Sequence, residues 1–303
     1  MDTFVHQQSP DIAGAVDTSK ERREGVSDNQ MDWFQGAGDQ GVMIGYACDE
    51  TKQLMPIPVV LANRIVRELS ACRQSSYIQG ILPDGKAQVT VEYENGKPVR
   101  LDSVVVSCQH TEDKNLKKLE AEIRKKVLLP ALRLLPPDED TKIFINPSGR
   151  FVCGGMDADT GLTGRKLMVD SYGSMVPHGG GAFSGKDCSK VDRSVAYMAR
   201  YIAKNIVAAR LASRCQVSLA YAIGVAQPVM VQVDTFGTGK VCADDCLELA
   251  IPLVFGLTPK QIVDSLRLTR PIFRQTAAFG HFGRKEFPWE RTDKVEALRN
   301  AVI

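Results

Sequence analysis

The chain has 303 residues, of which 44% are hydrophobic and 24% charged, with 25 glycines and 15 prolines. This composition is typical of a globular protein and excludes disordered, collagen-like and fibrous chains. Its 38 basic and 36 acidic residues leave a formal charge of +2, a basic excess too small for a chain whose main partner is nucleic acid. No apolar run approaches the roughly 18 residues that a transmembrane helix needs.

The cysteines and the first residues indicate the compartment. The opening sequence MDTFVHQQSPDIAG has neither the basic nor the apolar region of a signal peptide. Eight cysteines and four histidines are dispersed along the chain without a CxxC pair, which argues against a zinc site and against a disulfide framework. We therefore expect free thiols in a reducing, cytoplasmic compartment.

The hydrophobic periodicity predicts where helices and strands lie. Residues 1–40 are polar, and we expect no regular element before Gly41. In chain order we then expect a helix at 56–72, strands at 87–93 and 103–108, a helix at 115–135, strands at 142–145 and 150–153, a candidate strand at 167–170, a helix at 191–212, strands at 216–225 and 229–235, and a helix at 259–268. This order predicts an α+β fold in which each sheet is covered by helices on one face.

The glycine-rich segment 179–187 (GGGAFSGKD) is the densest functional signal. It comes one residue short of a P-loop, because Asp187 stands where that motif has the hydroxyl that binds Mg²⁺. A P-loop also follows its strand directly, whereas the candidate strand at 167–170 is separated from the glycines. A simple flexible turn is the other alternative, and it leaves the charges that follow unexplained.

Those charges are Lys186, Lys190, Asp192 and Arg193. A helix that begins near Ser189 would place both lysines at its N-terminus, where the helix dipole is already positive. A phosphate-rich ligand would remove this conflict, since amides and ammonium groups would converge on one polyanion. Asp192 could then hold a divalent metal on the phosphate oxygens; a structural salt bridge is its alternative role.

A second basic cluster ends the segment 159–166 (DTGLTGRK) with Arg165 and Lys166. It is a plausible phosphate clamp, although a basic pair in a loop is often just solvated. Phe151 could stack on a base or pack in a core. His178 and His281 have no partner at catalytic spacing, and we assign them no role.

Read together, these segments resemble the S-adenosylmethionine synthetase (methionine adenosyltransferase) family of the bacterial and eukaryotic type, from about Gln8 to the C-terminus. The resemblance is carried by GAGDQGVMIGYA (36–47), NPSGRF (146–151), GLTGRK (161–166), HGGGAFSGKD (178–187), SKVDRS (189–194) and GHFGR (280–284). It implies three interleaved, pseudo-threefold subdomains. We expect a gating loop and the entry to a C-terminal subdomain at 1–49, an N-terminal-type subdomain at 50–154, a remnant of the central subdomain at 155–193 and the C-terminal subdomain at 194–303.

The resemblance also implies a reaction. The sulfur of L-methionine attacks C5′ of ATP, the triphosphate leaves, and it is hydrolysed to pyrophosphate and phosphate. A thioether nucleophile needs little acid–base help, so the rate depends on alignment and on stabilising the charge of the leaving group. The family uses two Mg²⁺ ions per site and K⁺, and it builds each site between the subunits of a homodimer, often a dimer of dimers.

Site residues follow by position in the family's motifs. The resemblance assigns the catalytic cations to Lys86, Arg165, Lys186 and Lys190. It assigns ATP binding to Asp84, Gly85, Lys86, Arg150, Phe151, Asp159, Arg165, Lys166, Ala182 and Lys186. It assigns methionine binding to Gln8, Asp39, Asp159, Lys190 and Ile223, and metal binding to Asp192.

The sequence departs from the family in several places. We expect the first part of the central subdomain to be absent, with its GHPDK motif and the family's K⁺-binding and methionine-binding glutamates. The loop between Gln8 and Gly36 is longer than usual, and further substitutions near the site are Leu82, Met156, Pro177, Cys188 and Ala220. We therefore expect an adenosyltransferase whose isolated chain is impaired. The alternative is a non-catalytic paralogue, or a regulatory subunit in a heteromer with a full-length synthetase; neither nucleic acid nor membrane is an expected partner.

Overall fold

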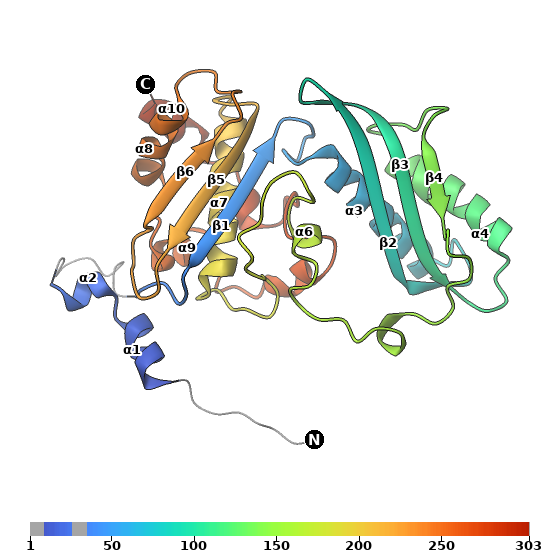
Figure 1. Cartoon of the computed structure of the whole chain (residues 1–303), viewed down its shortest axis with the longest axis horizontal. Helices are drawn as coiled ribbons and strands as arrows, with labels where there is room; N and C mark the ends of the chain where they lie inside the picture. The colour runs from blue at the N-terminus through green and yellow to red at the C-terminus, as the bar shows by residue number, and fades with distance from the viewer. Residues whose placement is uncertain (1–8, 26–34, 303) are drawn as a thin grey trace. The chain divides into compact units, whose positions relative to one another are not determined.

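The computed structural model describes residues 9–25 and 35–302 (Figure 1); Gln8 lies outside them. The chain divides into two compact units. The first unit comprises the described residues up to Asp49, Thr163–Ala277 and the described residues from Phe282 onward; the second comprises Glu50–Leu162 and Ala278–His281. Each unit has its own small sheet and helices, which confirms the α+β class.

The first unit is built on a three-stranded antiparallel sheet. Strand β1 (Gly41–Cys48) pairs with β5 (Arg214–Tyr221), and β5 pairs with β6 (Met230–Asp234). Helix α7 (Val191–Ala208) packs against β1 and β5 and is buried along nearly its whole length. Further helices of this unit are α8 (Asp244–Val254), which contacts β6, α9 (Pro259–Ser265) and α10 (Val295–Ala301).

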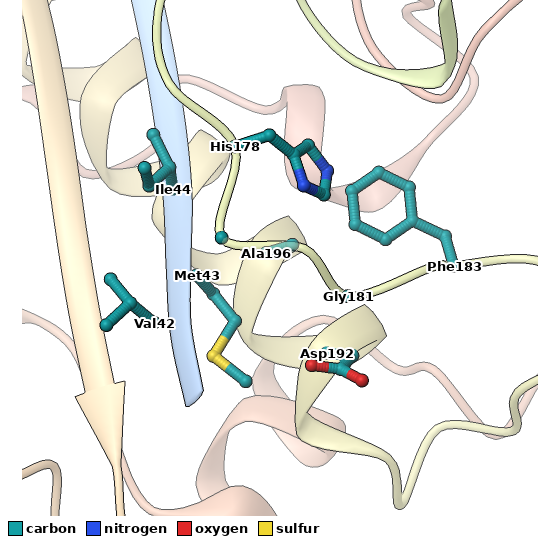
Figure 2. Close-up of a pocket in the computed structure, with 9 residues that line it drawn as sticks. Val42, Met43, Ile44, His178, Gly181, Phe183, Asp192 and Ala196 are labelled. Carbon is teal, nitrogen blue, oxygen red and sulfur yellow. The ribbon is translucent and has the colours of Figure 1, made fainter. Parts of the chain in front are cut away.

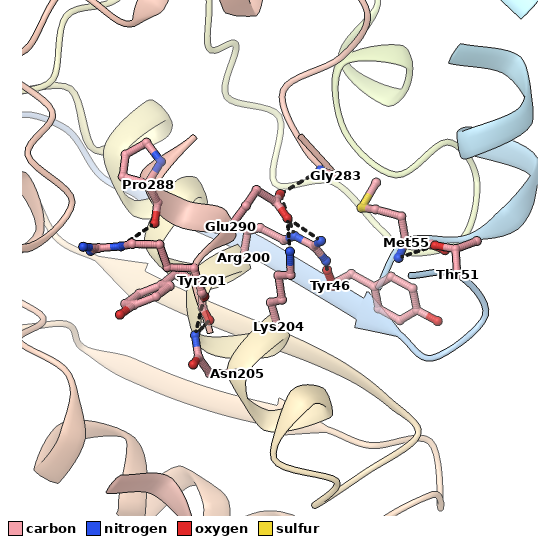
Figure 3. A network of polar contacts seen from close by, with 11 residues as sticks. Tyr46, Thr51, Met55, Arg200, Tyr201, Lys204, Asn205, Gly283, Pro288 and Glu290 are labelled. Atoms are coloured by element: carbon pink, nitrogen blue, oxygen red, sulfur yellow. Dashed lines mark hydrogen bonds and ion pairs between the residues drawn. The ribbon is translucent and has the colours of Figure 1, made fainter. Parts of the chain in front are cut away.

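A buried network of charges lies between α7 and the segment that leads to α10 (Figure 3). The Glu290 carboxylate accepts from Arg200 Nε at 3.1 Å and Nη2 at 2.9 Å, from Lys204 Nζ at 2.7 Å and from the Gly283 amide at 2.7 Å. Arg200 Nη1 also donates to the Tyr46 carbonyl of β1 at 2.7 Å. The network therefore ties together three segments that are far apart in the sequence.

The second unit is a hairpin with a third strand beside it. Strands β2 (Ile81–Glu94) and β3 (Lys97–His110) pair antiparallel, and β4 (Lys142–Ile145) lies parallel to β3. The turn residues Asn95 and Gly96 have φ values of 51° and 74°, the left-handed geometry of tight hairpin turns.

The helices of the second unit form its core with the sheet. Helix α3 (Ile57–Gln74) is followed later by α4 (Leu116–Ile123), a π-helical segment (Arg124–Leu128) and α5 (Leu129–Ala131). Their buried apolar residues pack with those of β3, among them Leu61, Ile65, Val104 and Ile123. The predicted helices at 56–72 and 115–135 are thus confirmed.

Most of the other predicted elements are also present, with different ends. Strands β2, β3, β5 and β6 contain or overlap the predicted ranges, and β4 matches its range. Helix α7 ends four residues before the predicted end at 212, and α9 three residues before 268. Helices α8 and α10 were not predicted.

Three expectations are wrong. Before Gly41 the chain forms α1 (Pro10–Asp17), with a proline in its first turn, and α2 (Lys20–Arg23), which the Ser19 side chain caps. The segment 167–170 is the short helix α6, because so short an apolar run does not distinguish helix from strand. Residues 150–153 are not a strand. The side chains of Gln109 and His110, at the end of β3, form hydrogen bonds with the Val152 carbonyl and the Phe151 amide, where a neighbouring strand would otherwise do so.

Two global expectations can be compared with the structure. All eight cysteines are free thiols, as predicted. Of the described helices, none is by itself long and apolar enough to cross a membrane; α8 and α9 pass that test only as a pair bent by 75°.

Candidate functional site

The glycine-rich loop before α7 lines a small pocket in the first unit (Figure 2). One wall is Val42–Ile44 of β1, and the others are His178, Gly179, Gly181 and Phe183 from the loop and Asp192 and Ala196 from α7. No role was predicted for His178 or the β1 residues. Their position beside the predicted metal ligand follows from the packing of α7 against β1 and from the close approach of Gly179 to Val42, which the local sequence does not show.

Two glycines are required for this loop to lie where it does. A Cβ atom on Gly179 would lie 1.6 Å from the carbonyl oxygen of Val42, and one on Gly181 would lie 2.3 Å from Asp192 Oδ1. Neither approach is possible for a residue with a side chain. The glycines therefore bring the loop backbone against both β1 and the carboxylate of Asp192.

His178 folds back on the same loop. Its Nδ1 accepts a hydrogen bond from the Gly180 amide at 2.8 Å, so the ring proton belongs on Nε2 in the neutral form. Burial lowers the pKa of the imidazole, and the charge of Asp192 partly opposes this. The neutral ring is thus the form that fits the loop.

The predicted phosphate-binding cations lie around the start of α7. Lys186 Nζ forms an ion pair with Asp192 Oδ2, and Lys190 is the exposed residue that precedes the first turn of the helix. The helix begins at Val191 and Lys190 is its N-cap residue, so both lysines lie at its N-terminal end. This ion pair is the salt bridge that the sequence offered as the alternative to metal binding by Asp192. Its other member, Lys186, is itself a predicted ATP ligand.

Arg193 has a different role from its neighbours. Its guanidinium donates to the Lys186 carbonyl at 2.6 Å, to Tyr197 Oη at 3.0 Å and to Thr276 Oγ1 at 2.9 Å, and it lies over the ring of Phe273. Because the residue is buried, it holds the loop to the protein interior and does not present its charge to a ligand.

The second basic cluster lies next to the glycine-rich loop. The nearest atom to a Cβ built on Gly164 is the Cβ of Ala182, at 3.1 Å, and a Cβ on Gly185 would be 3.9 Å from Thr163. Arg165 and Lys166, both exposed, follow directly. The structure thus brings the two basic clusters of the sequence together.

Asp187 and helix α6 bear on the P-loop alternative. The Asp187 carboxylate accepts from the Ser189 amide at 2.7 Å, and hydrogen bonds from Ser189 lower its pKa. The segment before the glycines is helix α6 and not a strand. Both features disagree with a P-loop, in which a strand leads directly into the phosphate loop.

Two predicted methionine-binding residues lie at neighbouring chain segments of the first unit. Asp39 is exposed just before β1, and Ile223 is 42% exposed just after β5. A bridge between Ala37 and Ile223 joins these segments.

The α2 helix is attached beside them. The Lys20 amide donates to the Gly224 carbonyl at 2.8 Å. The carboxylate of Glu21 accepts from the amides of Ala226, at 2.9 and 3.1 Å, and Gln227, at 3.1 Å.

The remaining predicted ATP-binding residues belong to the second unit, where Gly85 and Lys86 are exposed on β2. Asp84 precedes them, and its Oδ2 accepts from the Gly155 amide at 2.9 Å. Arg150 forms an exposed ion pair with Glu112 at 3.1 Å. Asp159 Oδ1 accepts from the Gly161 amide at 3.1 Å, and Phe151 is hydrogen-bonded through its backbone to His110.

The donor set fits Mg²⁺ better than a metal enclosed by protein ligands. Among the described residues, no group of three or more histidine, cysteine, aspartate or glutamate side chains could hold a metal ion. Mg²⁺ commonly binds through one or two carboxylates together with phosphate oxygens and water. Asp192 is one such carboxylate, and the predicted phosphate-binding residue Lys186 lies against it.

Two models of one protein family match this chain. Residues 34–151 match the family model described as S-adenosylmethionine synthetase, central domain, and residues 153–291 match the model of its C-terminal domain; the N-terminal domain is not matched. These models divide the chain differently from our four segments with boundaries at 49, 154 and 193, which stay a prediction.

A close relative agrees with both domain matches. An S-adenosylmethionine synthase of Desulforudis audaxviator (strain MP104C) is 54% identical over 301 residues, which is 99% of this chain and 75% of the relative. This chain therefore belongs to the S-adenosylmethionine synthetase family.

Proposed function

We propose that this chain synthesises S-adenosylmethionine from ATP and L-methionine. One observation carries most of the weight: the loops at 163–166 and 179–190 lie together and carry Arg165, Lys166, Lys186 and Lys190. Lys186 also pairs with the carboxylate of Asp192. Several cations and a single acidic metal ligand in one place suit a triphosphate better than a monoanionic ligand.

The reaction needs these groups mainly for the leaving triphosphate. A lone pair of the methionine sulfur forms the new bond to C5′, the bond between C5′ and the α-phosphate oxygen breaks, and the electron pair leaves with the triphosphate. Water then cleaves the triphosphate to pyrophosphate and phosphate. In this proposal Lys186, Lys190 and Arg165 stabilise the charge that develops on the phosphate oxygens.

Metal ions would act on the same oxygens. Mg²⁺, when bound, neutralises phosphate charge, and Asp192 is the residue of this chain that we propose to hold it. Lys186 now pairs with Asp192, so we expect the lysine to turn toward the phosphates when a metal takes its place at the carboxylate. The chain offers no assigned ligand for K⁺ among its predicted site residues.

The proposed substrate contacts are assigned to residues of each unit in turn. We propose that Asp84, Gly85, Lys86, Arg150, Phe151 and Asp159 contribute the nucleotide contacts of the second unit. We propose that Asp39 and Ile223, with Gln8, contact methionine. A homodimer, a dimer of dimers or a heteromer with a full-length synthetase would complete the site.

The test is product formation by the 303-residue chain with ATP, methionine, Mg²⁺ and K⁺, followed by mass spectrometry. S-adenosylmethionine above background supports the proposal. ATP binding without product supports the alternative of a non-catalytic or regulatory subunit, and absence of both ATP binding and product contradicts the family assignment of function.

Variants test the phosphate assignment. We expect Lys186→Ala and Lys190→Ala each to weaken triphosphate handling by about tenfold or more, far more than they weaken methionine affinity, because a charge-assisted contact to phosphate is lost. Lys117→Ala is the matched control, since Lys117 is an exposed lysine on α4. Equal losses for ATP and methionine would contradict the assignment.

A further inference from the structure

The pairing of β2 with β3 is interrupted where β3 ends. Ile81 pairs with His110 and Gly85 with Cys108, so three residues of β2 stand opposite Gln109 alone. Asp84 belongs to this bulge, and its amide has no place in the strand ladder. A bulge of this kind redirects a side chain and is often found beside a functional site.

Gln109 occupies the bulge with its side chain. Its Oε1 accepts from the Asp84 amide at 3.2 Å, and its Nε2 donates to the Val152 carbonyl at 3.0 Å. The residue is buried. One amide side chain thus joins the start of the β2 ladder to the segment that carries Phe151, and Asp84 Oδ2 adds a second link through the Gly155 amide.

His110 holds the same segment one residue farther on. Its backbone amide donates to the Phe151 carbonyl at 2.9 Å, and its Nε2 accepts from the Phe151 amide at 3.0 Å. Its Nδ1 lies 2.8 Å from the Thr111 carbonyl, so this pattern of bonds assigns the ring proton to Nδ1. Both backbone polar groups of Phe151 are therefore satisfied by His110.

The buried core is made by other residues. The apolar cluster beneath the sheet consists of side chains such as Leu101, Val104 and Val106, whereas Gln109 Nε2 donates to the Val152 carbonyl and His110 Nε2 accepts from the Phe151 amide. Removing these two nitrogens would leave partly buried backbone groups of Phe151 and Val152 without these partners. The expected consequence is local: the segment would lose its fixed position while the core remains.

We propose that Gln109 and His110 are positioning residues for nucleotide binding, which fix Asp84 and Phe151 in the arrangement that receives ATP. This inference rests on the proposed function, because it takes Asp84 and Phe151 as nucleotide contacts. Neither residue needs to touch the nucleotide. They act through the backbone of the residues that do.

The experiment measures ATP binding and local order in the same variants. Gln109→Met keeps the size of the side chain without its hydrogen bonds, and His110→Leu removes the acceptor for the Phe151 amide. We expect each to weaken binding of ATP with Mg²⁺ by about tenfold or more in calorimetric titration. We also expect faster hydrogen–deuterium exchange at residues 151–155.

Two further variants separate positioning from general stability. His110→Gln restores an acceptor near the Nε2 position and should recover ATP binding to within about threefold of the original chain. Val104→Ala weakens the core of the same strand; it should lower Tm while leaving ATP affinity within about twofold. Loss of affinity in proportion to the fall in Tm across all variants would overturn the inference.

The remaining outcomes distinguish this inference from the proposed function. If Phe151→Ala and Asp84→Asn weaken ATP binding but Gln109→Met and His110→Leu do not, the positioning role is wrong and the nucleotide assignment stands. If Phe151→Ala and Asp84→Asn also leave ATP binding unchanged, the nucleotide assignment fails. Unchanged hydrogen–deuterium exchange at residues 151–155 in His110→Leu would overturn the positioning role, whatever the measured affinity for ATP.

Discussion

Replacing Glu290 with glutamine is the sharpest test of what holds the first unit together. The carboxylate accepts four hydrogen bonds, three of them from the cations Arg200 and Lys204 and one from the Gly283 amide. A glutamine side chain of nearly the same size keeps the shape of the site but not its charge. The two cations would then face each other without a counter-ion.

The structure sets the size of the effect. The side chains of Glu290 and Arg200 are 0% exposed and that of Lys204 is 10% exposed, so water cannot replace the lost carboxylate. Removing one partner of a buried ion pair costs about 3–5 kcal/mol. For a unit of this size that corresponds to a fall in Tm of about 6–20 °C.

The assay is urea denaturation followed by far-UV circular dichroism, with calorimetry for Tm. Glu296→Gln is the matched control, since Glu296 pairs with Arg299 at the surface and is 77% exposed; its cost should stay within about 0.5 kcal/mol. A free energy of unfolding for Glu290→Gln within about 1 kcal/mol of the original chain would refute the reasoning.

The same carboxylate predicts a dependence on pH. Burial by itself raises the pKa of Glu290, but the charges and hydrogen bonds of Arg200 and Lys204 outweigh it and hold the pKa below its ordinary value. Its stabilisation is therefore fully present above the unfolded-state pKa of about 4.3 and is lost as the pH falls through the lower folded-state pKa. Glu290→Gln should lack this part of the acid dependence when the two proteins are titrated side by side.

Three further predictions concern the site and its surroundings. Glu21→Gln removes the negative charge that accepts from the Ala226 and Gln227 amides. We therefore expect trypsin to cut more rapidly after the basic residues of α2. The control Glu24→Gln, at an exposed ion pair, should change the cleavage rate little. Gly179→Ala should lower the free energy of unfolding, measured by urea denaturation, by more than about 3 kcal/mol because its Cβ meets the β1 backbone. Gly180→Ala has open space around its Cβ but a φ of +97°, so it should lower that free energy by about 1 kcal/mol. Equal losses would contradict the close approach of Gly179 to β1. Asp192→Asn should raise the Mg²⁺ concentration that gives half the maximal rate by about tenfold or more, and an unchanged Mg²⁺ requirement would remove it as the metal ligand.

Hydrophobic periodicity is clearest in a helix that buries one face. Helix α3 has buried residues at Leu61, Ile65 and Leu69, spaced four apart, and the prediction of this helix was confirmed. Helix α8 was not predicted. It carries the apolar residues Leu249 and Leu253 on its exposed face, which blurs the periodicity, and it contains Pro252, a residue that usually ends a helix. Its signal was the acidic pair in its first turn, which suits the positive end of a helix.

The candidate site was predictable only as a set of motifs. Lys186 and Lys190 stand out in the sequence because cations at the start of a helix conflict with its dipole. The ion pair between Lys186 and Asp192 requires the loop between them to fold back, and the anchoring of Arg193 depends on Thr276, 83 residues away. Side-chain pairing over such distances is set by tertiary packing, which no local pattern encodes. The assigned roles themselves stay predictions.

The order of segments in the first unit has a consequence for synthesis on the ribosome. Strand β1 ends at Cys48, but its only neighbour among the described strands, β5, begins at Arg214. The residues of the second unit from Glu50 to Leu162 are made in between. At about 5–20 residues per second, β1 waits roughly 8–33 seconds for its partner. During that interval its apolar side chains and unpaired backbone are exposed to other chains and to chaperones, while the second unit already has nearly all of its sequence. Until Arg214 and the rest of β5 are made, β1 is therefore a strand with open edges, the kind of segment at which nascent chains associate.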